Sequence, residues 1–205
     1  MNSQSIPFKL KYNTYKNLAH GYLNPNIPSY LILYVNNKCQ LRCDMCFYWD
    51  SMQVPNKELT LNEITSISKG FPNLLQLTLT GGEPSLRKDL AKIPGIFAKY
   101  SNLAKCTLVT NGMLYKRIAN YVEEMVTENK YVDFRIAVSV DGIGELHDNI
   151  RGVKGSYANL IKTLDLLFIL RSKYSNLWID INTVISKYNY LEFENIHNYI
   201  KNNLD

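Results

Sequence analysis

Apolar residues along this chain follow two spacings: short, nearly continuous runs, and longer stretches in which they recur every three or four positions. The short runs, rich in β-branched residues, predict strands, whereas the longer spacing predicts amphipathic helices. The predicted strands are residues 31–36, 75–80, 105–110, 134–140 and 178–185. A helical stretch follows each strand, and the apolar faces of these stretches include Ile64, Phe97, Val122, Leu164 and Ile196. Strand and helix therefore alternate five times, which predicts an α/β fold with a parallel sheet.

Capping residues predict where several of these helices begin. Thr60 and Glu63 have the spacing of a capping box, in which each residue bonds the other's backbone N–H. Ser156 is the expected N-cap of the fourth helix, because a serine oxygen can accept from the first free N–H groups. Asn189 lies where the last helix should start. These signals place helix starts directly after loops.

Other stretches of the chain are harder to assign. A short helix containing Tyr15 and Leu18 is expected before the first strand. Pro94, followed by glycine, predicts a break or kink in the second helical stretch, since proline lacks the N–H of the helical ladder. Residues 145–152 are interpreted as a loop between the fourth strand and its helix.

Composition indicates a globular protein. The chain has 205 residues, of which 46% are hydrophobic and 12% aromatic. It contains no apolar run of membrane-span length, and residues 1–30 lack the apolar core of a secretory signal, so we expect no membrane partner and a cytoplasmic location. The net charge is +5, but the basic residues are interleaved with acidic ones. This pattern does not favour a nucleic-acid partner.

Three of the four cysteines, Cys39, Cys43 and Cys46, lie in one loop directly after the first predicted strand. Thiolates are soft ligands, and three from one loop can hold an iron–sulfur cluster while leaving one iron without a protein ligand. Structural zinc usually takes four ligands in two Cys-x2-Cys pairs, and the sequence has no second pair. Cys106 stands alone in the third predicted strand, where we expect a small buried residue rather than a fourth ligand.

The spacing Cys-x3-Cys-x2-Cys after the first strand, with Gly81-Gly82-Glu83-Pro84 after the second, resembles two signature motifs of the radical S-adenosylmethionine (SAM) superfamily. The resemblance covers about residues 31–190 and is strongest to maturase-like members with a C-terminal cysteine-rich domain. It implies a [4Fe-4S] cluster held by Cys39, Cys43 and Cys46, with SAM at the open iron. It also implies an oxidoreductase in which the reduced cluster cleaves SAM to a 5′-deoxyadenosyl radical that abstracts hydrogen from a substrate.

Several residues after the strands are candidates for binding the cofactor. Gly81 and Gly82 permit a close approach of the backbone to a small polar ligand. Glu83 can pair with the cofactor's ammonium group in a charge-assisted contact. Ser139 and Arg151 match positions that contact the cofactor's carboxylate in the maturase-like proteins, and the planar arginine fork suits a carboxylate.

Other candidates have an equally plain structural interpretation. Asn111 and Asp141 each stand beside a glycine after a strand, where they could reach ribose hydroxyls or substrate, or simply form a turn. Ile185, ending the fifth strand, is expected either to pack on the adenine or to belong to the core. His147 could titrate near neutral pH but needs no catalytic role. Met45 stands where the family often has an aromatic residue. The sequence assigns no catalytic acid, base or radical relay.

We expect two regions in the chain, an N-terminal extension over residues 1–30 and a radical SAM core over residues 31–205. The resemblance implies a partial (β/α) barrel with five βα units, since the sixth strand and helix usual in the family are missing. Polar residues after the strands should converge on one rim of such a barrel. A missing unit exposes strand edges, which native proteins avoid, so we expect either a longer protein or a partner that closes the sheet.

Three hypotheses about function remain open at this point. The first is an enzyme acting on a peptide or a small molecule, supplied with electrons by an external donor of the flavodoxin or ferredoxin type. The second is a cluster- and SAM-binding module that is inactive without a further C-terminal part or a partner. The third is a zinc-stabilised interaction domain. The substrate does not follow from the fold, because function depends on the site that a fold carries.

Overall fold

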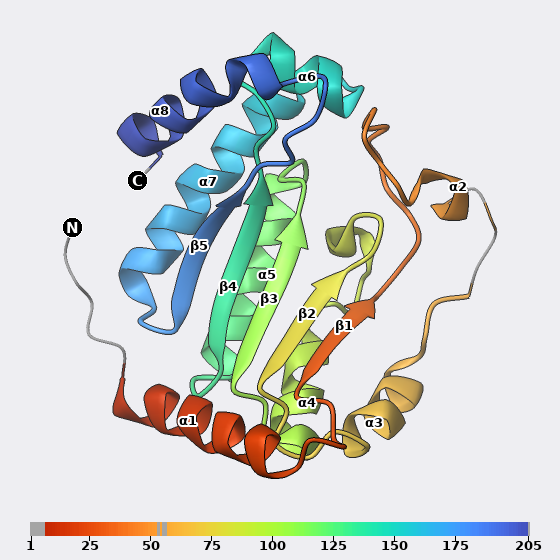
Figure 1. Cartoon of the computed structure of the whole chain (residues 1–205), viewed down its shortest axis with the longest axis vertical. Helices are drawn as coiled ribbons and strands as arrows, with labels where there is room; N and C mark the ends of the chain where they lie inside the picture. The colour runs from red at the N-terminus through yellow and green to blue at the C-terminus, as the bar shows by residue number, and fades with distance from the viewer. Residues whose placement is uncertain (1–6, 53, 55–56, 205) are drawn as a thin grey trace.

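The structure, a computed structural model, describes residues 7–52, 54 and 57–204. Five strands form one sheet in the order in which they occur along the chain, and each neighbouring pair is parallel (Figure 1). The strands are β1 (Tyr30–Tyr34), β2 (Gln76–Thr80), β3 (Lys105–Thr110), β4 (Asp133–Ser139) and β5 (Leu177–Asn182). This open parallel sheet confirms the predicted α/β fold and its partial barrel.

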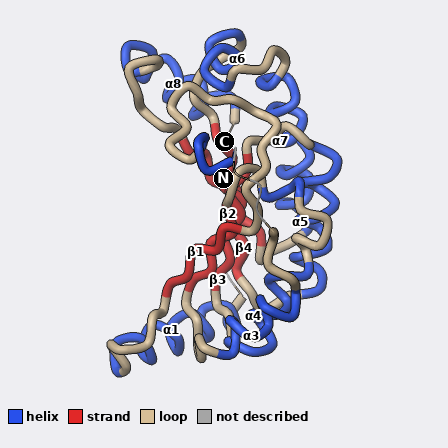
Figure 2. Tube along the Cα trace, turned by 90° about the vertical axis from the view of Figure 1, so that its right-hand side faces the viewer, coloured by secondary structure: helices blue, strands red, loops and turns tan. Residues whose placement is uncertain are grey.

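Helices cover one face of the sheet, as Figure 2 shows from the side. They are α3 (Leu61–Lys69), α4 (Lys92–Ser101), α5 (Tyr115–Glu128) and α7 (Ser156–Lys173). Four further helices lie beyond the ends of the strands: α1 (Phe8–Leu23), α2 (Trp49–Met52), α6 (Glu145–Arg151) and α8 (Phe193–Asn203). Two 3₁₀ turns complete the described chain, η1 (Pro84–Leu86) and η2 (Tyr190–Glu192).

The hydrophobic core lies between the sheet and this layer of helices. Leu79 and Ile136 of the sheet belong to the same buried cluster as Phe97 and Leu164 of the helices. Burying one such side chain stabilises the fold by about 1.5–3 kcal/mol. Cys106 is part of this cluster and is 1% exposed, as its position in a strand predicts. The core therefore fixes the strands whose ends carry the candidate site.

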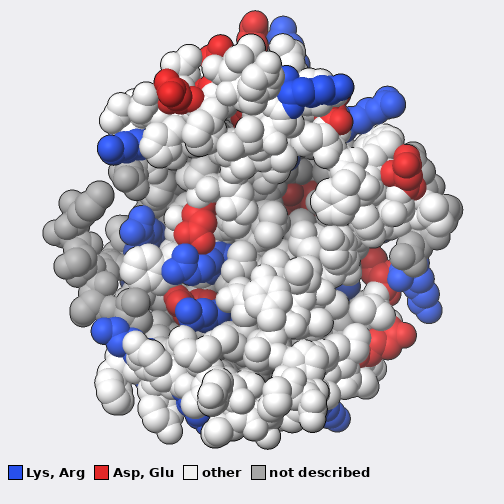
Figure 3. Space-filling view, in the orientation of Figure 1, with Lys and Arg blue, Asp and Glu red and all other residues white. Residues whose placement is uncertain are grey.

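The opposite face of the sheet is turned toward the viewer in Figure 1. Polar side chains from neighbouring strands bond to one another on this face. Gln76 donates to the hydroxyl of Thr107 over 2.8 Å, and Arg135 forms a 3.1 Å ion pair with Asp180. On this side of the molecule, Lys and Arg are interspersed with Asp and Glu rather than gathered in one basic block (Figure 3). The face thus differs from the apolar interior of a closed, fully packed barrel.

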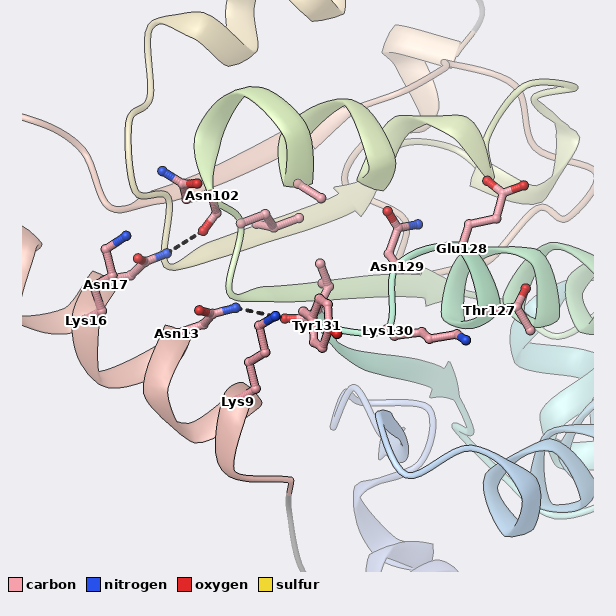
Figure 4. Close-up of a pocket in the computed structure, with 13 residues that line it drawn as sticks. Lys9, Asn13, Lys16, Asn17, Asn102, Thr127, Glu128, Asn129, Lys130 and Tyr131 are labelled. Atoms are coloured by element: carbon pink, nitrogen blue, oxygen red, sulfur yellow. Dashed lines mark hydrogen bonds between the residues drawn. The ribbon is translucent and has the colours of Figure 1, made fainter.

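Helix α1 closes the end of the sheet where the strands begin. The amide of Asn17 is buried and donates to the carbonyl oxygens of Leu74 (2.9 Å) and Asn102 (2.7 Å), as Figure 4 shows in part. A hollow of about 370 Å³ lies beside α1 and includes Lys9 and Lys130 in its lining, but none of the predicted site residues. Residues 8–23 of the predicted N-terminal extension are thus packed against the sheet, while residues 1–6 lie outside the described part.

The capping box at the start of α3 is confirmed. Thr60 Oγ1 accepts from the N–H of Glu63 (3.2 Å), and the Glu63 carboxylate accepts from the N–H of Thr60 (2.7 Å). The predicted break at Pro94 is wrong, because α4 begins at Lys92 and Pro94 lies in its first turn. N–H groups in a first turn have no partner within the helix, so proline is tolerated there.

Two further predictions around α6 and α7 are wrong. The segment interpreted as a loop, residues 145–152, contains the helix α6. Ser156 is the first residue of α7 rather than its N-cap, which is Gly155. The carboxylate of Asp148, at 2.6–2.8 Å, accepts from the N–H groups of Gly155 and Tyr157 and from the hydroxyl of Ser156. A side chain from the preceding helix therefore caps α7, which local sequence could not indicate.

Candidate functional site

The three loop cysteines lie at the end of the sheet where the strands finish. They line one hollow of about 200 Å³ together with Gly81, Gly82, Glu83, Asn111, Ser139 and Arg151. These residues follow or end β1, β2, β3 and β4, or belong to α6. The structure thus brings together most of the residues that the sequence singled out, because the carboxyl ends of parallel strands meet at one edge.

Two of the predicted residues do not line this hollow. The side chain of Asp141 has no exposed surface and lies behind Arg151. Ile185 follows β5, which ends at Asn182, and is 57% exposed. The predicted strand over 178–185 is therefore too long at its end, and Ile185 is neither in the core nor in the lining of this hollow.

The two glycines allow the turn after β2 to lie directly against the cysteine loop. Gly82 donates to the carbonyl of Asn36 (3.2 Å), and the next N–H, of Glu83, donates to the carbonyl of Lys38 (2.7 Å). Gly81 has a φ of +150°, and a Cβ there would collide with the carbonyl oxygen of Asn36. A Cβ on Gly82 would collide with that of Lys38. Any larger residue would therefore push the two loops apart.

Glu83 is buried and uses most of its carboxylate inside the protein. It accepts from the N–H of Ser85 (3.0 Å), from the hydroxyl of Thr110 (2.8 Å) and from the N–H of Asn111 (2.8 Å). Burial raises the pKa of Glu83, and these donors oppose that shift. A carboxylate has about four acceptor positions, so roughly one remains for a ligand. Thr110, which ends β3, is a site residue that the sequence alone did not single out.

Arg151 contacts both a buried carboxylate and a cysteine. Its Nη2 forms a 2.5 Å ion pair with Asp141, and its Nη1 lies 3.6 Å from Cys43 Sγ as a hydrogen-bond donor. Asp141 also accepts from the N–H of Val184 (2.8 Å). Among the described residues, the buried Nε of Arg151 has no partner. Only two of the five N–H groups of the guanidinium are used in these contacts.

The cysteine loop is docked on the end of α6 through its backbone. The N–H of Arg42 donates to the carbonyl of Arg151 (3.2 Å), and the N–H of Asp44 donates to the carbonyl of Ile150 (3.0 Å). Gly152, with a φ of +70°, ends α6, and a Cβ there would collide with the carbonyl oxygen of Arg42. Helix α6 is thus the surface that shapes the loop, although the sequence predicted no helix there.

His147 was the remaining candidate, and the structure buries it within α6. Its Nδ1 accepts from the N–H of Asp141 at 3.3 Å, and its ring lies 5.8 Å from that of Tyr157. Burial, with a smaller contribution from the charge of Arg151, lowers the pKa of His147 to about 4. A neutral imidazole is therefore the form that the fold accommodates.

The donor set of the hollow fits an iron–sulfur cluster. The pKa of Cys39 is raised to about 11, mainly by burial and also by the charges of Glu83 and the neighbouring thiols. A hydrogen bond from the N–H of Leu41 opposes this shift. Burial also raises the pKa of Cys43, opposed by Arg151. Crowded thiols of this kind lose their protons readily only when a cation offsets the charge. The Nδ2 of Asn111 donates to Cys39 Sγ over 3.7 Å, so two polar side chains face the sulfurs.

Within the described ranges, no three His, Cys, Asp or Glu side chains form a group that could hold a single metal ion. None of the helices in the described part of the chain has the length and apolar character needed to cross a membrane.

The chain resembles curated proteins over part of their length. It is 32% identical over 137 residues to the GTP 3′,8-cyclase of Pasteurella multocida, which covers 62% of this chain and 41% of the cyclase. It is 30% identical over 174 residues to the AdoMet-dependent heme synthase of Methanosarcina barkeri, covering 80% of this chain and 44% of the synthase. The chain therefore spans less than half the length of these two relatives.

Solved structures show the same fold. A structure titled native anSMEcpe with bound AdoMet matches with a TM-score of 0.62 at 21% identity, over 84% of this chain and 48% of that one. Streptococcus suis SuiB matches with a TM-score of 0.59 at 21% identity, over 95% of this chain and 42% of SuiB.

The family model described as the radical SAM superfamily matches residues 33–200. This range includes the cysteine loop, the glycine turn and every strand except the first residues of β1. A [4Fe-4S] cluster and SAM are the cofactors of that family, as the sequence motifs implied. The chain belongs to the radical SAM superfamily.

Proposed function

We propose that Cys39, Cys43 and Cys46 hold a [4Fe-4S] cluster and that the adjoining residues bind SAM at its open iron. The single observation that carries this proposal is the convergence of the three cysteines and the glycine turn on one hollow. When bound, these cofactors supply reductive cleavage of SAM, yielding a 5′-deoxyadenosyl radical that removes hydrogen from a substrate. The chemistry belongs to the cofactors, whereas the chain binds, orients and shields them.

The roles of the binding residues follow from their free polar atoms. Arg151 and Ser139 both line the hollow, and a guanidinium with unused N–H groups suits the carboxylate of SAM. The remaining acceptor position of Glu83, with the backbone of Gly81 and Gly82, suits its ammonium group. Asn111 lies beside Cys39 and bounds the hollow near the sulfurs. Phe47, which is 88% exposed, also contributes to the lining and can exclude water once a ligand is bound.

We propose a peptide as the substrate class, in a maturase-like enzyme of the cytoplasm that receives electrons from a flavodoxin- or ferredoxin-type donor. The support is a likeness of fold, since solved structures of SuiB and anSMEcpe with bound peptides match this chain at 19–20% identity. The GTP 3′,8-cyclase relatives make a small molecule the alternative substrate class. Residues 31–205 would form the catalytic core. Within the extension over residues 1–30, α1 would support this core at the end of the sheet where the strands begin.

A second candidate function is a cluster- and SAM-binding module that needs further polypeptide to turn over. The observations favouring it are that the chain spans less than half the length of the cyclase and the synthase, and that its sheet is open. In this second candidate function, the further polypeptide would be a C-terminal part or a partner that completes the barrel.

Anaerobic reconstitution tests both candidates. We expect iron and sulfide to bind with the absorption of a [4Fe-4S] cluster, and Cys43→Ala to lose most of that iron. Cys106→Ala is the matched control, because this cysteine is buried in the core away from the hollow. Release of 5′-deoxyadenosine after dithionite and SAM are added would distinguish an enzyme from a binding module. Full iron loading by Cys43→Ala, or zinc in place of iron in the parent chain, would contradict the proposal.

A further inference from the structure

Asp141 is buried, and each of its polar groups has a partner either in α6 or in the loop after β5. Its N–H donates to His147 Nδ1 (3.3 Å), and its carbonyl accepts from Asn189 Nδ2 (3.0 Å). One carboxylate oxygen accepts from the N–H of Val184 (2.8 Å), and the other pairs with Arg151 (2.5 Å). Asp141 therefore joins β4, α6 and the loop after β5 at one point.

Arg151 links Asp141 to the cysteine loop. Its Nη1 donates to Cys43 Sγ at 3.6 Å, while its carbonyl accepts from the N–H of Arg42 at 3.2 Å. A guanidinium is planar, so fixing one edge on Asp141 fixes the direction of the remaining N–H groups. The side chain is only 9% exposed, which leaves it little room to adopt another rotamer.

The contact with sulfur has an electronic consequence once a cluster is bound. Hydrogen bonds to the thiolates that hold an iron–sulfur cluster are among the features that set its reduction potential. Such a donor favours the reduced, more negative state, because it stabilises charge on the sulfur. Loss of the Arg151 contact should therefore make the cluster harder to reduce.

We propose that Asp141 is a positioning residue that holds Arg151 against Cys43 and thereby sets the reduction potential of the cluster. This inference rests on the cysteine ligand set proposed above. Asp141 acts on the cofactor only through Arg151, since it has no exposed surface and does not line the hollow.

The direction in which one substitution shifts the midpoint potential distinguishes the positioning of Arg151 from a direct effect of the Asp141 charge. Asp141→Asn keeps the size of the side chain but removes a negative charge close to the cluster. A direct effect of that charge would make the cluster easier to reduce, moving its midpoint potential upward. If Asp141 acts by holding Arg151, the substitution releases the guanidinium from Cys43 and moves the potential downward.

The experiment is a redox titration of the anaerobically reconstituted chain, followed by the electron paramagnetic resonance signal of the reduced cluster. We expect Asp141→Asn and Arg151→Gln to shift the midpoint in the same, negative direction. Asp180→Asn is the matched control, because it removes the carboxylate charge from an Asp–Arg pair on the open face of the sheet that has no contact with a cysteine. That control should leave the midpoint and the signal unchanged.

A positive shift or no shift in Asp141→Asn would overturn the inference. If Asp141→Asn does not fold, Arg151→Lys decides the question. One ammonium group cannot reproduce the planar fork that meets both partners, so a negative shift is expected and an unchanged midpoint overturns the inference. Absence of any cluster in the parent chain would instead contradict the proposed ligand set, so the two failures are distinguishable.

Discussion

Two of the arginine–aspartate pairs in this fold, Arg151–Asp141 and Arg135–Asp180, lie in different surroundings. Arg151 and Asp141 meet behind the cysteine loop with side-chain exposures of 9% and 0%, whereas Arg135 and Asp180 meet on the open face of the sheet with exposures of 43% and 38%. A buried pair is costly to break because the partner left behind is an unpaired charge, while a half-exposed pair is compensated by water. The Arg151–Asp141 pair is therefore expected to hold the site in place, whereas the Arg135–Asp180 pair is expected to contribute little to the free energy of unfolding.

The largest expected effect comes from breaking each pair in turn. Asp141→Ala should lower the free energy of unfolding by about 3–5 kcal/mol, since it leaves the Arg151 charge buried and unpaired. Asp180→Ala should lower it by at most about 1 kcal/mol. Urea unfolding of the metal-free chain, followed by circular dichroism, measures both values. Equal losses in the two variants would show that burial does not separate the pairs.

Acid should destabilise the buried region through His147. Its pKa is about 6.5 in an unfolded chain and about 4 in the fold, so the unfolded state binds more protons between these values. Stability should therefore be complete above pH 6.5 and fall by about 3 kcal/mol as the pH drops to 4. His147→Gln should lack this component in urea titrations at several pH values. His197→Gln, which replaces an exposed histidine, should follow the parent chain.

The docking of the cysteine loop on α6 can be tested with two glycines. Gly152 and Gly155 both have a positive φ, +70° and +83°, but only Gly152 faces a backbone atom of another segment, the carbonyl oxygen of Arg42. Strain from the backbone conformation alone is about 1–2 kcal/mol for either alanine variant. Gly152→Ala should lose about 1–3 kcal/mol more than Gly155→Ala, and should bind less iron on reconstitution. Similar iron contents in the two variants would argue against docking by α6.

The smallest expected effect is the change that salt causes in the coupling energy of the exposed ion pair. A double-mutant cycle on Arg135 and Asp180 should give a coupling of less than about 1 kcal/mol that weakens further in 1 M NaCl, because mobile ions screen exposed charges. The coupling between Arg151 and Asp141 should change little over the same range, since ions do not reach a buried pair. A salt-sensitive coupling at Asp141 would indicate that this pair is open to solvent.

Much of the fold could be predicted from local patterns. The strand at 105–110 and the capping box at Thr60 were predicted correctly because each depends on residues close together in the chain. The helix of residues 145–151 was missed because it is short, and its structure depends on packing against the cysteine loop. The end of β5 was misplaced because Thr183 and Val184 bond to the chain around Asp141 instead of continuing the ladder.

The candidate site, like the fold, was predictable only where its features depend on residues close together in the chain. The cysteine spacing and the glycine turn identify the family and its cofactors from sequence, because ligand type and close backbone approach are local requirements. Only the tertiary structure places Asp141 behind Arg151, directs Arg151 toward Cys43 and fills the carboxylate of Glu83 with internal donors. The contacts of Arg151 with Cys43 and of Glu83 with Asn111 join residues far apart in the chain, and the strength of all three contacts depends on burial, which no local pattern specifies.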